Sequence, residues 1–174
     1  MPIQYSVLKK RELAAPGLFD SVNSIAEQLR AHLDQSTTQA LLKERHVVGA
    51  SSAAIQEIIL SESQRLGFHS ESKGLFSDYE VTALRPDYFC SIGNTGILLE
   101  VERGKTIENN MDLLDLWKCH ICSRADYLFL VVPQVRPTTK GGITQQFSHV
   151  AKRLSPFFQI GNYVNVEAVF LFGY

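Results

Sequence analysis

Residues 96–102 read Gly-Ile-Leu-Leu-Glu-Val-Glu, an apolar run that ends in two glutamates separated by one residue. Side chains of a β-strand alternate between its two faces, so Glu100 and Glu102 share one face with Leu98. Their attachment points lie roughly 7 Å apart, and two like charges held that close on an apolar strand repel each other. A divalent cation such as Mg²⁺, which takes carboxylate oxygens as ligands, removes this repulsion. The stretch therefore predicts a buried strand that presents a metal site.

A third carboxylate lies on the preceding segment. A glycine-containing turn at residues 93–96 separates this strand from the extended segment 87–92, which predicts a β-hairpin. Antiparallel pairing around the turn brings Asp87 close to Glu100 or Glu102. We therefore expect the three carboxylates to form one cluster.

The spacing of these residues resembles a known motif. Pro86-Asp87, followed after a dozen residues by Glu100-Val101-Glu102, is similar to the PD-(D/E)XK motif of the restriction-endonuclease-like nucleases. The resemblance covers roughly residues 53–133. It implies a metal-dependent DNA endonuclease, a hydrolase that cleaves phosphodiester bonds with Mg²⁺ or Mn²⁺. It further implies that Asp87, Glu100 and Glu102 are both metal ligands and catalytic residues.

The chain departs from this motif at the usual lysine, which is replaced by Glu102 in a variant similar to that of some restriction enzymes. In relatives without the lysine a cation can come from elsewhere. Lys105, in the turn after the strand, is our first candidate for the catalytic cation, and Lys118 on the next helix is the second. The family also often carries a glutamate on the helix before the first strand, where Glu62 lies on the apolar face and Glu57 points away.

Hydrophobic periodicity predicts an α/β fold, a mixed central β-sheet flanked by helices, and the resemblance implies that this fold has a restriction-endonuclease-like core. The first helix is expected to begin at Asp20 or Ser21 and the third at Asn109 or Asn110, because these side chains can cap a helix. The predicted helices are 21–33, 53–66, 110–123 and 144–154, and the predicted strands are 74–81, 87–92, 97–103, 127–132 and 164–172. Residues 41–48 remain ambiguous.

Length and composition favour one domain that spans residues 1–174, with an N-terminal helical segment 1–50 and a core 51–174. The chain has 174 residues, of which 45% are hydrophobic. Lys and Arg total 17 against 18 for Asp and Glu, so any DNA-binding surface would have to be local. A polar N-terminus and the lack of a long apolar run predict a cytoplasmic protein with no membrane partner.

Three cysteines, Cys90, Cys119 and Cys122, are an odd number, which argues against a disulfide framework. A zinc site at Cys119-x-x-Cys122 with His120 would need further ligands at suitable spacing, so buried helix cysteines are favoured. Residues 104–106, Gly-Lys-Thr, resemble the end of a phosphate-binding loop, but the upstream glycine is missing and nucleotide binding is not expected.

Two alternatives stay open. Glu100 and Glu102 could decorate a solvated sheet face, and Asp87 could be an ordinary strand-entry residue after Pro86. The chain could then be a catalytically inactive module that binds nucleic acid or protein on the same fold. If it does cut both strands of DNA, a homodimer is the simplest arrangement for a single small domain.

Overall fold

A computed structural model of the chain describes residues 2–47, 52–70, 74–80, 84–104, 106–137 and 142–174. Its centre is a mixed six-stranded sheet in the order β1-β8-β5-β4-β3-β2. The strands of this sheet are β1 (Gln4–Lys9), β2 (His69–Ser70), β3 (Tyr88–Ile92), β4 (Thr95–Val101), β5 (Tyr127–Val132) and β8 (Ala168–Gly173). A short two-stranded ribbon is formed by β6 (Arg136–Pro137) and β7 (Ile143–Thr144).

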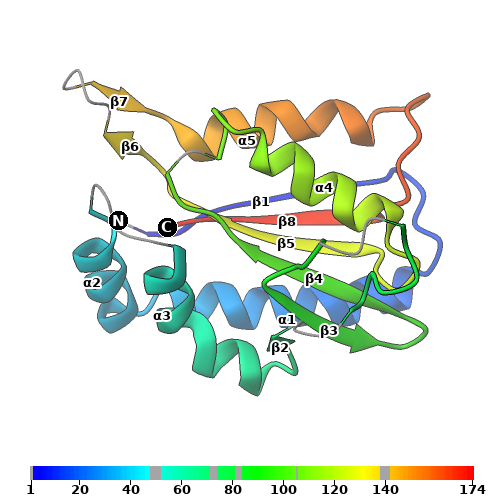
Figure 1. Ribbon diagram of the computed structural model, residues 1–174, viewed down its shortest axis with the longest axis horizontal. Coiled ribbons are helices and arrows are strands. Elements are labelled where there is room, and N and C mark those ends of the chain that lie inside the picture. Colours follow the sequence, from blue (N-terminus) through cyan, green and yellow to red (C-terminus); the bar gives the residue numbers. More distant parts are fainter. Residues whose placement is uncertain (1, 48–51, 71–73, 81–83, 105, 138–141) are drawn as a thin grey trace.

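Helices cover both faces of the sheet, so the predicted α/β class is confirmed (Figure 1). They are α1 (Pro16–Leu33), α2 (Ser36–Arg45), α3 (Ser52–Arg65), α4 (Met111–Ile121) and α5 (Gln146–Leu154), with a 3-10 turn at Ser155–Phe158. Figure 1 shows α1, α2 and α3 on one side of the sheet and α4 and α5 on the other. Across the described ranges, no helix is both long and apolar enough to cross a bilayer.

Alternation along β4 divides its side chains between two hydrophobic cores. Ile97 and Leu99 pack with residues of α1 and α3, such as Leu29 and Ile55, whereas Leu98 packs on the α4 and α5 side. This is the division expected of a central strand with both faces covered. Glu100, two residues after Leu98, therefore belongs to the α4 side of the sheet.

The connections bring three strand ends to one edge of the sheet. β3 and β4 form an antiparallel hairpin, while β4, β5 and β8 are mutually parallel neighbours. Crossovers through α4 and α5 are what parallel neighbours require. The carboxyl ends of β4, β5 and β8 therefore meet, and open α/β sheets bind ligands outside such ends.

Several predicted elements agree with the structure. β5 has the predicted bounds, and β3 and β4 differ from prediction by one or two residues at their ends. α3 ends before Gly67, whose φ of +90° lies in the left-handed region that glycine adopts without strain. The local signals for these elements were strong, so the hairpin and its flanking elements follow from sequence.

Other predictions are wrong. The expected strand 74–81 is a turn over the described residues 75–78, and β3 instead pairs with the short β2. β1 and α2 were not expected, because β1 is an edge strand with half-exposed side chains and α2 buries only Thr38 and Leu42. α1 begins at Pro16, where proline fits the first helical turn, rather than at a capping side chain.

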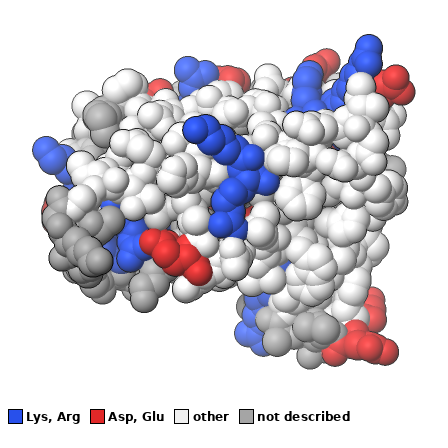
Figure 2. All heavy atoms as spheres, turned by 90° about the horizontal axis from the view of Figure 1, so that it is seen from above, with Lys and Arg blue, Asp and Glu red and all other residues white. Residues whose placement is uncertain are grey.

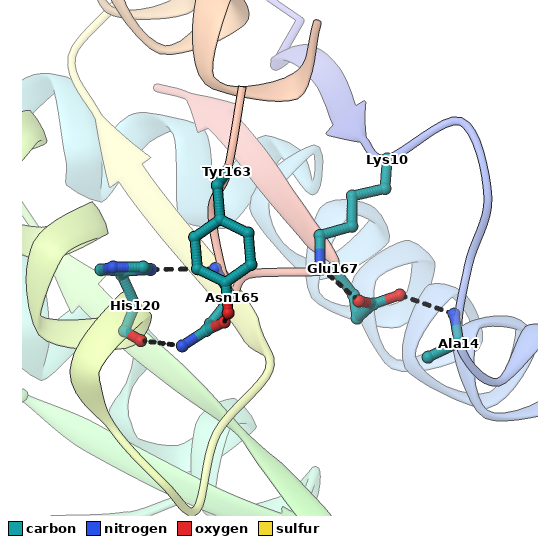
Figure 3. Close-up of polar contacts among 6 residues, drawn as sticks. All are labelled: Lys10, Ala14, His120, Tyr163, Asn165 and Glu167. Atoms are coloured by element: carbon teal, nitrogen blue, oxygen red, sulfur yellow. Dashed lines mark hydrogen bonds and ion pairs between the residues drawn. The ribbon is translucent and has the colours of Figure 1, made fainter. Parts of the chain in front are cut away.

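Polar contacts hold the amino-terminal edge of the parallel strands, opposite to the edge where Glu100 and Glu102 lie (Figure 3). Glu167, which directly precedes β8 and is 7% exposed, accepts hydrogen bonds from Lys10 Nζ at 2.7 Å and from the Ala14 backbone N–H at 2.8 Å. These bonds tie the loop after β1 to the start of β8. Glu167 is a buried carboxylate with a structural role.

The cysteines are buried and free, as predicted. Cys119 Sγ lies 3.8 Å from the Ala125 carbonyl oxygen, and His120 Nδ1 accepts a hydrogen bond from the Asn165 N–H at 2.9 Å (Figure 3). Burial raises the pKa of the Cys119 thiol well above its usual value, which disfavours the thiolate that zinc binds. The structure therefore gives the Cys119-x-x-Cys122 segment a place in the core.

Candidate active site

Three carboxylates meet where the hairpin strands reach the carboxyl edge of the sheet. Tyr88 pairs with Leu99, so Asp87 lies opposite Glu100. The Asp87 N–H donates to Glu100 Oε2 at 3.2 Å, and the Val101 N–H donates to Asp87 Oδ2 at 2.8 Å. Glu102 follows the last residue of β4, and its N–H donates to the Val131 carbonyl oxygen at 2.8 Å. The expected approach of Asp87 to Glu100 is confirmed.

A lysine from α4 enters this cluster. Lys118 Nζ hydrogen-bonds Glu100 Oε1 and lies 2.9 Å from Asp115 Oδ1. The side chains of all three residues are at most 7% exposed. Lys118, our second candidate for the catalytic cation, lies beside Glu100 because α4 turns its side chain inward onto the strand. Lys105, our first candidate for the cation, lies outside the described residues.

Sequence reasoning missed the acidic side chains of α4. Asp112, Asp115 and Lys118 recur every three residues, a spacing that places them on one helix face. Asp112 and Asp115 are fully buried. Arg153 of α5 lies beside Asp112, with its Nε 3.0 Å from Oδ2, so Asp112 has its own cation. The Asp-x-x-Asp-x-x-Lys spacing was the signal that could have revealed this inner face.

Burial shifts the protonation of the cluster. It raises the pKa of Glu102 to about 7, and repulsion from Asp115 and Asp87 adds to the shift. Burial also raises the pKa of Asp115 to about 6, although Lys118 opposes this. The pKa of Glu100 is raised well above its usual value, chiefly by burial and then by Asp115. Carboxyl groups that titrate near neutral pH are typical of sites that bind metals or move protons.

These shifts predict how stability depends on pH. Because the pKa values of Glu102 and Asp115 rise to about 7 and about 6 from 4.5 and 3.8, the folded protein binds more protons than the unfolded chain across that range. The free energy of unfolding therefore falls as pH rises through it. We expect a higher melting temperature at pH 5 than at pH 8 in EDTA, and a weaker dependence in Glu102→Gln. Scanning calorimetry measures both, and a wild-type melting temperature that rises from pH 5 to pH 8 would contradict the expectation.

The residue of α3 at this site is Gln56 rather than Glu62. Burial raises the pKa of Asp87, while the Val101 N–H, Lys118 and a hydrogen bond with the Gln56 side chain lower it. Glu62 forms an ion pair with Arg65 instead, at 2.6 Å, and this contact lowers its pKa. Glu57 is exposed, as predicted. The accessory role expected of Glu62 is therefore not supported by its position.

The carboxylate oxygens of the cluster are suitable ligands for a hard cation, although in the structure they surround the Lys118 ammonium. Carboxylate oxygens are the ligands that Mg²⁺ prefers. Among the residues that the structure describes, no group of three or more His, Cys, Asp or Glu side chains has the arrangement that holds a metal ion. Glu100 Oε1 faces the Lys118 ammonium and Glu100 Oε2 faces the Asp87 N–H. A bound metal would have to share Glu100 with these partners.

Charged side chains on the α4 and α5 side of the molecule are scattered. Figure 2 views the side of the molecule formed by α4 and α5. There the Lys and Arg side chains lie in separate groups, some beside Asp or Glu at the rim and one near the centre within uncharged surface. The described atoms of this view form no continuous basic strip. Electrostatics thus gives no reason for DNA to approach across α4 and α5.

In comparisons with known proteins, no protein-family model matches the chain, and no curated protein matches its sequence. Function must therefore be argued from the site.

Proposed function

We propose that the chain is a metal-dependent DNA endonuclease with a restriction-endonuclease-like core, in which Asp87, Glu100 and Glu102 bind Mg²⁺ or Mn²⁺. The observation that carries this proposal is an excess of negative charge. Asp87, Glu100, Glu102 and Asp115 lie around one ammonium group, that of Lys118. Buried charges need compensation. When all four carboxyl groups are ionised, the single ammonium does not neutralise them, and a bound cation would supply the missing positive charge.

The fold supports the same proposal. The resemblance implies a helix, a three-strand meander, a crossover helix and a fourth strand. The helix α3, the hairpin β3–β4, the helix α4 and the parallel strand β5 follow in that order, whereas the first strand of the meander, expected at 74–81, is a turn over residues 75–78. Gln56 on the preceding helix α3 contacts Asp87, and it comes from the helix on which the resemblance implies a glutamate. The cluster also lies at the edge of the sheet where α/β proteins bind their ligands.

Each residue then has a defined task. Asp87, Glu100 and Glu102 would hold the metal, which supplies Lewis-acid stabilisation of the phosphate and lowers the pKa of water. Glu102 would contribute a ligand to the metal or position the attacking water. Lys118, oriented by Asp115 at 2.9 Å, can stabilise the negative charge that develops on the phosphate. We therefore prefer Lys118 to Lys105 as the catalytic cation.

One competing function is favoured by a specific observation. Lys118 already compensates Glu100 and Asp115, so the cluster could be a structural ion-pair network in an inactive binding module. Cleavage separates the two readings. The nuclease should nick supercoiled plasmid DNA with Mg²⁺ or Mn²⁺ and should stop in EDTA. A folded protein that leaves the plasmid intact at every metal concentration would contradict the proposal.

The α3 side chains give a matched pair of variants. Because Gln56 contacts Asp87, Gln56→Ala should slow plasmid cleavage by about tenfold, the loss expected for one supporting contact near a metal ligand. Glu62→Ala removes only a partly exposed ion pair and should leave the cleavage rate unchanged, with at most about 0.5 kcal/mol of lost stability. Initial nicking rates measure both variants. Equal rates for Gln56→Ala and wild type would remove Gln56 from the site.

A further inference from the structure

A hollow of about 460 Å³ lies at the same edge of the sheet as the carboxylate cluster. α2 forms one wall, and the segment after β5 together with the last residue of the chain forms the other. Its lining includes Gln39, Leu42, Lys43, His46, Gln134 and Tyr174. Sites for small ligands commonly have this size and mix apolar walls with a few polar groups.

Tyr174 joins this pocket to the proposed active site. Its Oη donates a hydrogen bond to the Glu102 carbonyl oxygen at 3.2 Å. Its backbone is held by the end of β5, where the Tyr174 N–H donates to the Val132 carbonyl at 2.9 Å and the Gln134 N–H donates to the Tyr174 carbonyl at 2.6 Å. Tyr174 therefore joins the hollow, on the α2 side of the sheet, to the backbone of Glu102, whose side chain lies toward α4 on the other side of the same edge.

The lining groups suit a flat aromatic ring with polar edges. The rings of His46 and Tyr174 meet edge to face, with centroids 5.4 Å apart. His46 Nδ1 is buried without a hydrogen-bond partner in the described structure, so a base could bond to it once the His46 ring turns toward the hollow. Lys43 is exposed at the pocket and can meet a neighbouring negative charge. An aromatic base followed by a phosphate has this combination of groups.

We propose that the pocket binds one unpaired nucleobase of a strand that crosses this edge of the sheet to reach the carboxylates, and that the preferred substrate is therefore single-stranded or locally unpaired DNA. A base within an intact duplex is stacked and paired, so it could enter the pocket only after unpairing. This inference rests on the proposed nuclease function, because it places the base relative to the same carboxylates.

Ala40 offers a direct test. It lines the pocket and is exposed on α2, so Ala40→Trp should fill the hollow without disturbing the core. Thr37→Trp puts the same side chain at an exposed position of α2 outside the lining and serves as the control. Fluorescence anisotropy with a labelled oligothymidylate, in Ca²⁺ to prevent cleavage, measures binding. We expect Ala40→Trp to weaken binding about tenfold or more, the effect of losing one stacked base, and Thr37→Trp to leave it unchanged.

Duplex DNA of the same length completes the test. Wild type should bind and cleave the single strand in preference to the duplex, and Ala40→Trp should reduce that preference. Equal affinity of wild type for both DNAs, or unchanged single-strand binding by Ala40→Trp, would overturn the pocket assignment while leaving the nuclease proposal intact. Pocket-dependent binding of the single strand without any cleavage in Mg²⁺ or Mn²⁺ would overturn the nuclease function on which the assignment rests.

Discussion

Lys118→Met is expected to lower the free energy of unfolding by about 3–5 kcal/mol at pH 8 in EDTA. The variant keeps most of the side-chain volume but leaves Glu100 and Asp115 buried without the ammonium that they both contact. At pH 5 the loss should be smaller, because raised pKa values let these carboxyl groups take up protons instead. Urea unfolding at the two pH values measures the difference.

Lys152→Met is the matched control for this variant. Lys152 is exposed in the last turn of α5, so its replacement should change stability by no more than about 0.5 kcal/mol at either pH. Mg²⁺ or Mn²⁺ should restore part of the stability lost in Lys118→Met, since a cation can again balance the carboxylates. If Lys118→Met is as stable as wild type at pH 8, Lys118 does not compensate the buried charge.

Glu100→Gln is expected to slow DNA cleavage by about a thousandfold or more, because a neutral amide is a poor ligand for a hard cation. Folding should survive. The Gln side chain can still accept the hydrogen bond from the Asp87 N–H, and Lys118 keeps its ion pair with Asp115. Without metal the variant should be at least as stable as wild type at pH 8, since one of several mutually repelling carboxylates is gone.

Glu167→Gln serves as the control, because we expect it to change stability rather than cleavage. Glu167 is also a buried carboxylate, but it binds Lys10 and the Ala14 N–H at the far edge of the sheet (Figure 3). Its replacement should lower stability and leave the cleavage rate per folded molecule unchanged. Single-turnover rates together with thermal melting separate the two variants. Full cleavage activity in Glu100→Gln would show that Glu100 is not a metal ligand.

Local sequence signals were sufficient for the hairpin and its acidic cluster. Alternation in residues 97–101 and the turn at 93–96 fix the register, which places Asp87 opposite Glu100. The same signals failed for residues 74–81. Gly74 has a φ of +107°, and Leu75 and Phe76 are buried within a turn rather than alternating along a strand. Apolar side chains that a turn carries into the core resemble a strand in sequence.

The environment of the cluster could not be predicted in the same way. Whether Lys118 points toward β4 depends on the rotation of α4 about its axis, which packing against the sheet decides. Tertiary packing also decides that Gln56, rather than Glu62, lies at the carboxylate cluster. Helical spacing places Glu62 on the apolar face of α3, but in the structure Gln56 contacts Asp87, and Glu62, further along the helix, pairs with Arg65. Contacts between elements distant in sequence are set by tertiary packing.

Direct metal binding is the measurement that separates a catalytic centre from a structural ion-pair network. Isothermal titration of the metal-free protein with Mn²⁺ at pH 8 should show saturable binding, and binding should weaken toward pH 5 as protons compete for Glu102, whose pKa is about 7. Glu100→Gln should lose this binding, and Glu167→Gln should keep it. A folded wild-type protein that binds no Mn²⁺ at pH 8 would contradict the account, because Lys118 and bound protons alone would then balance the carboxylates.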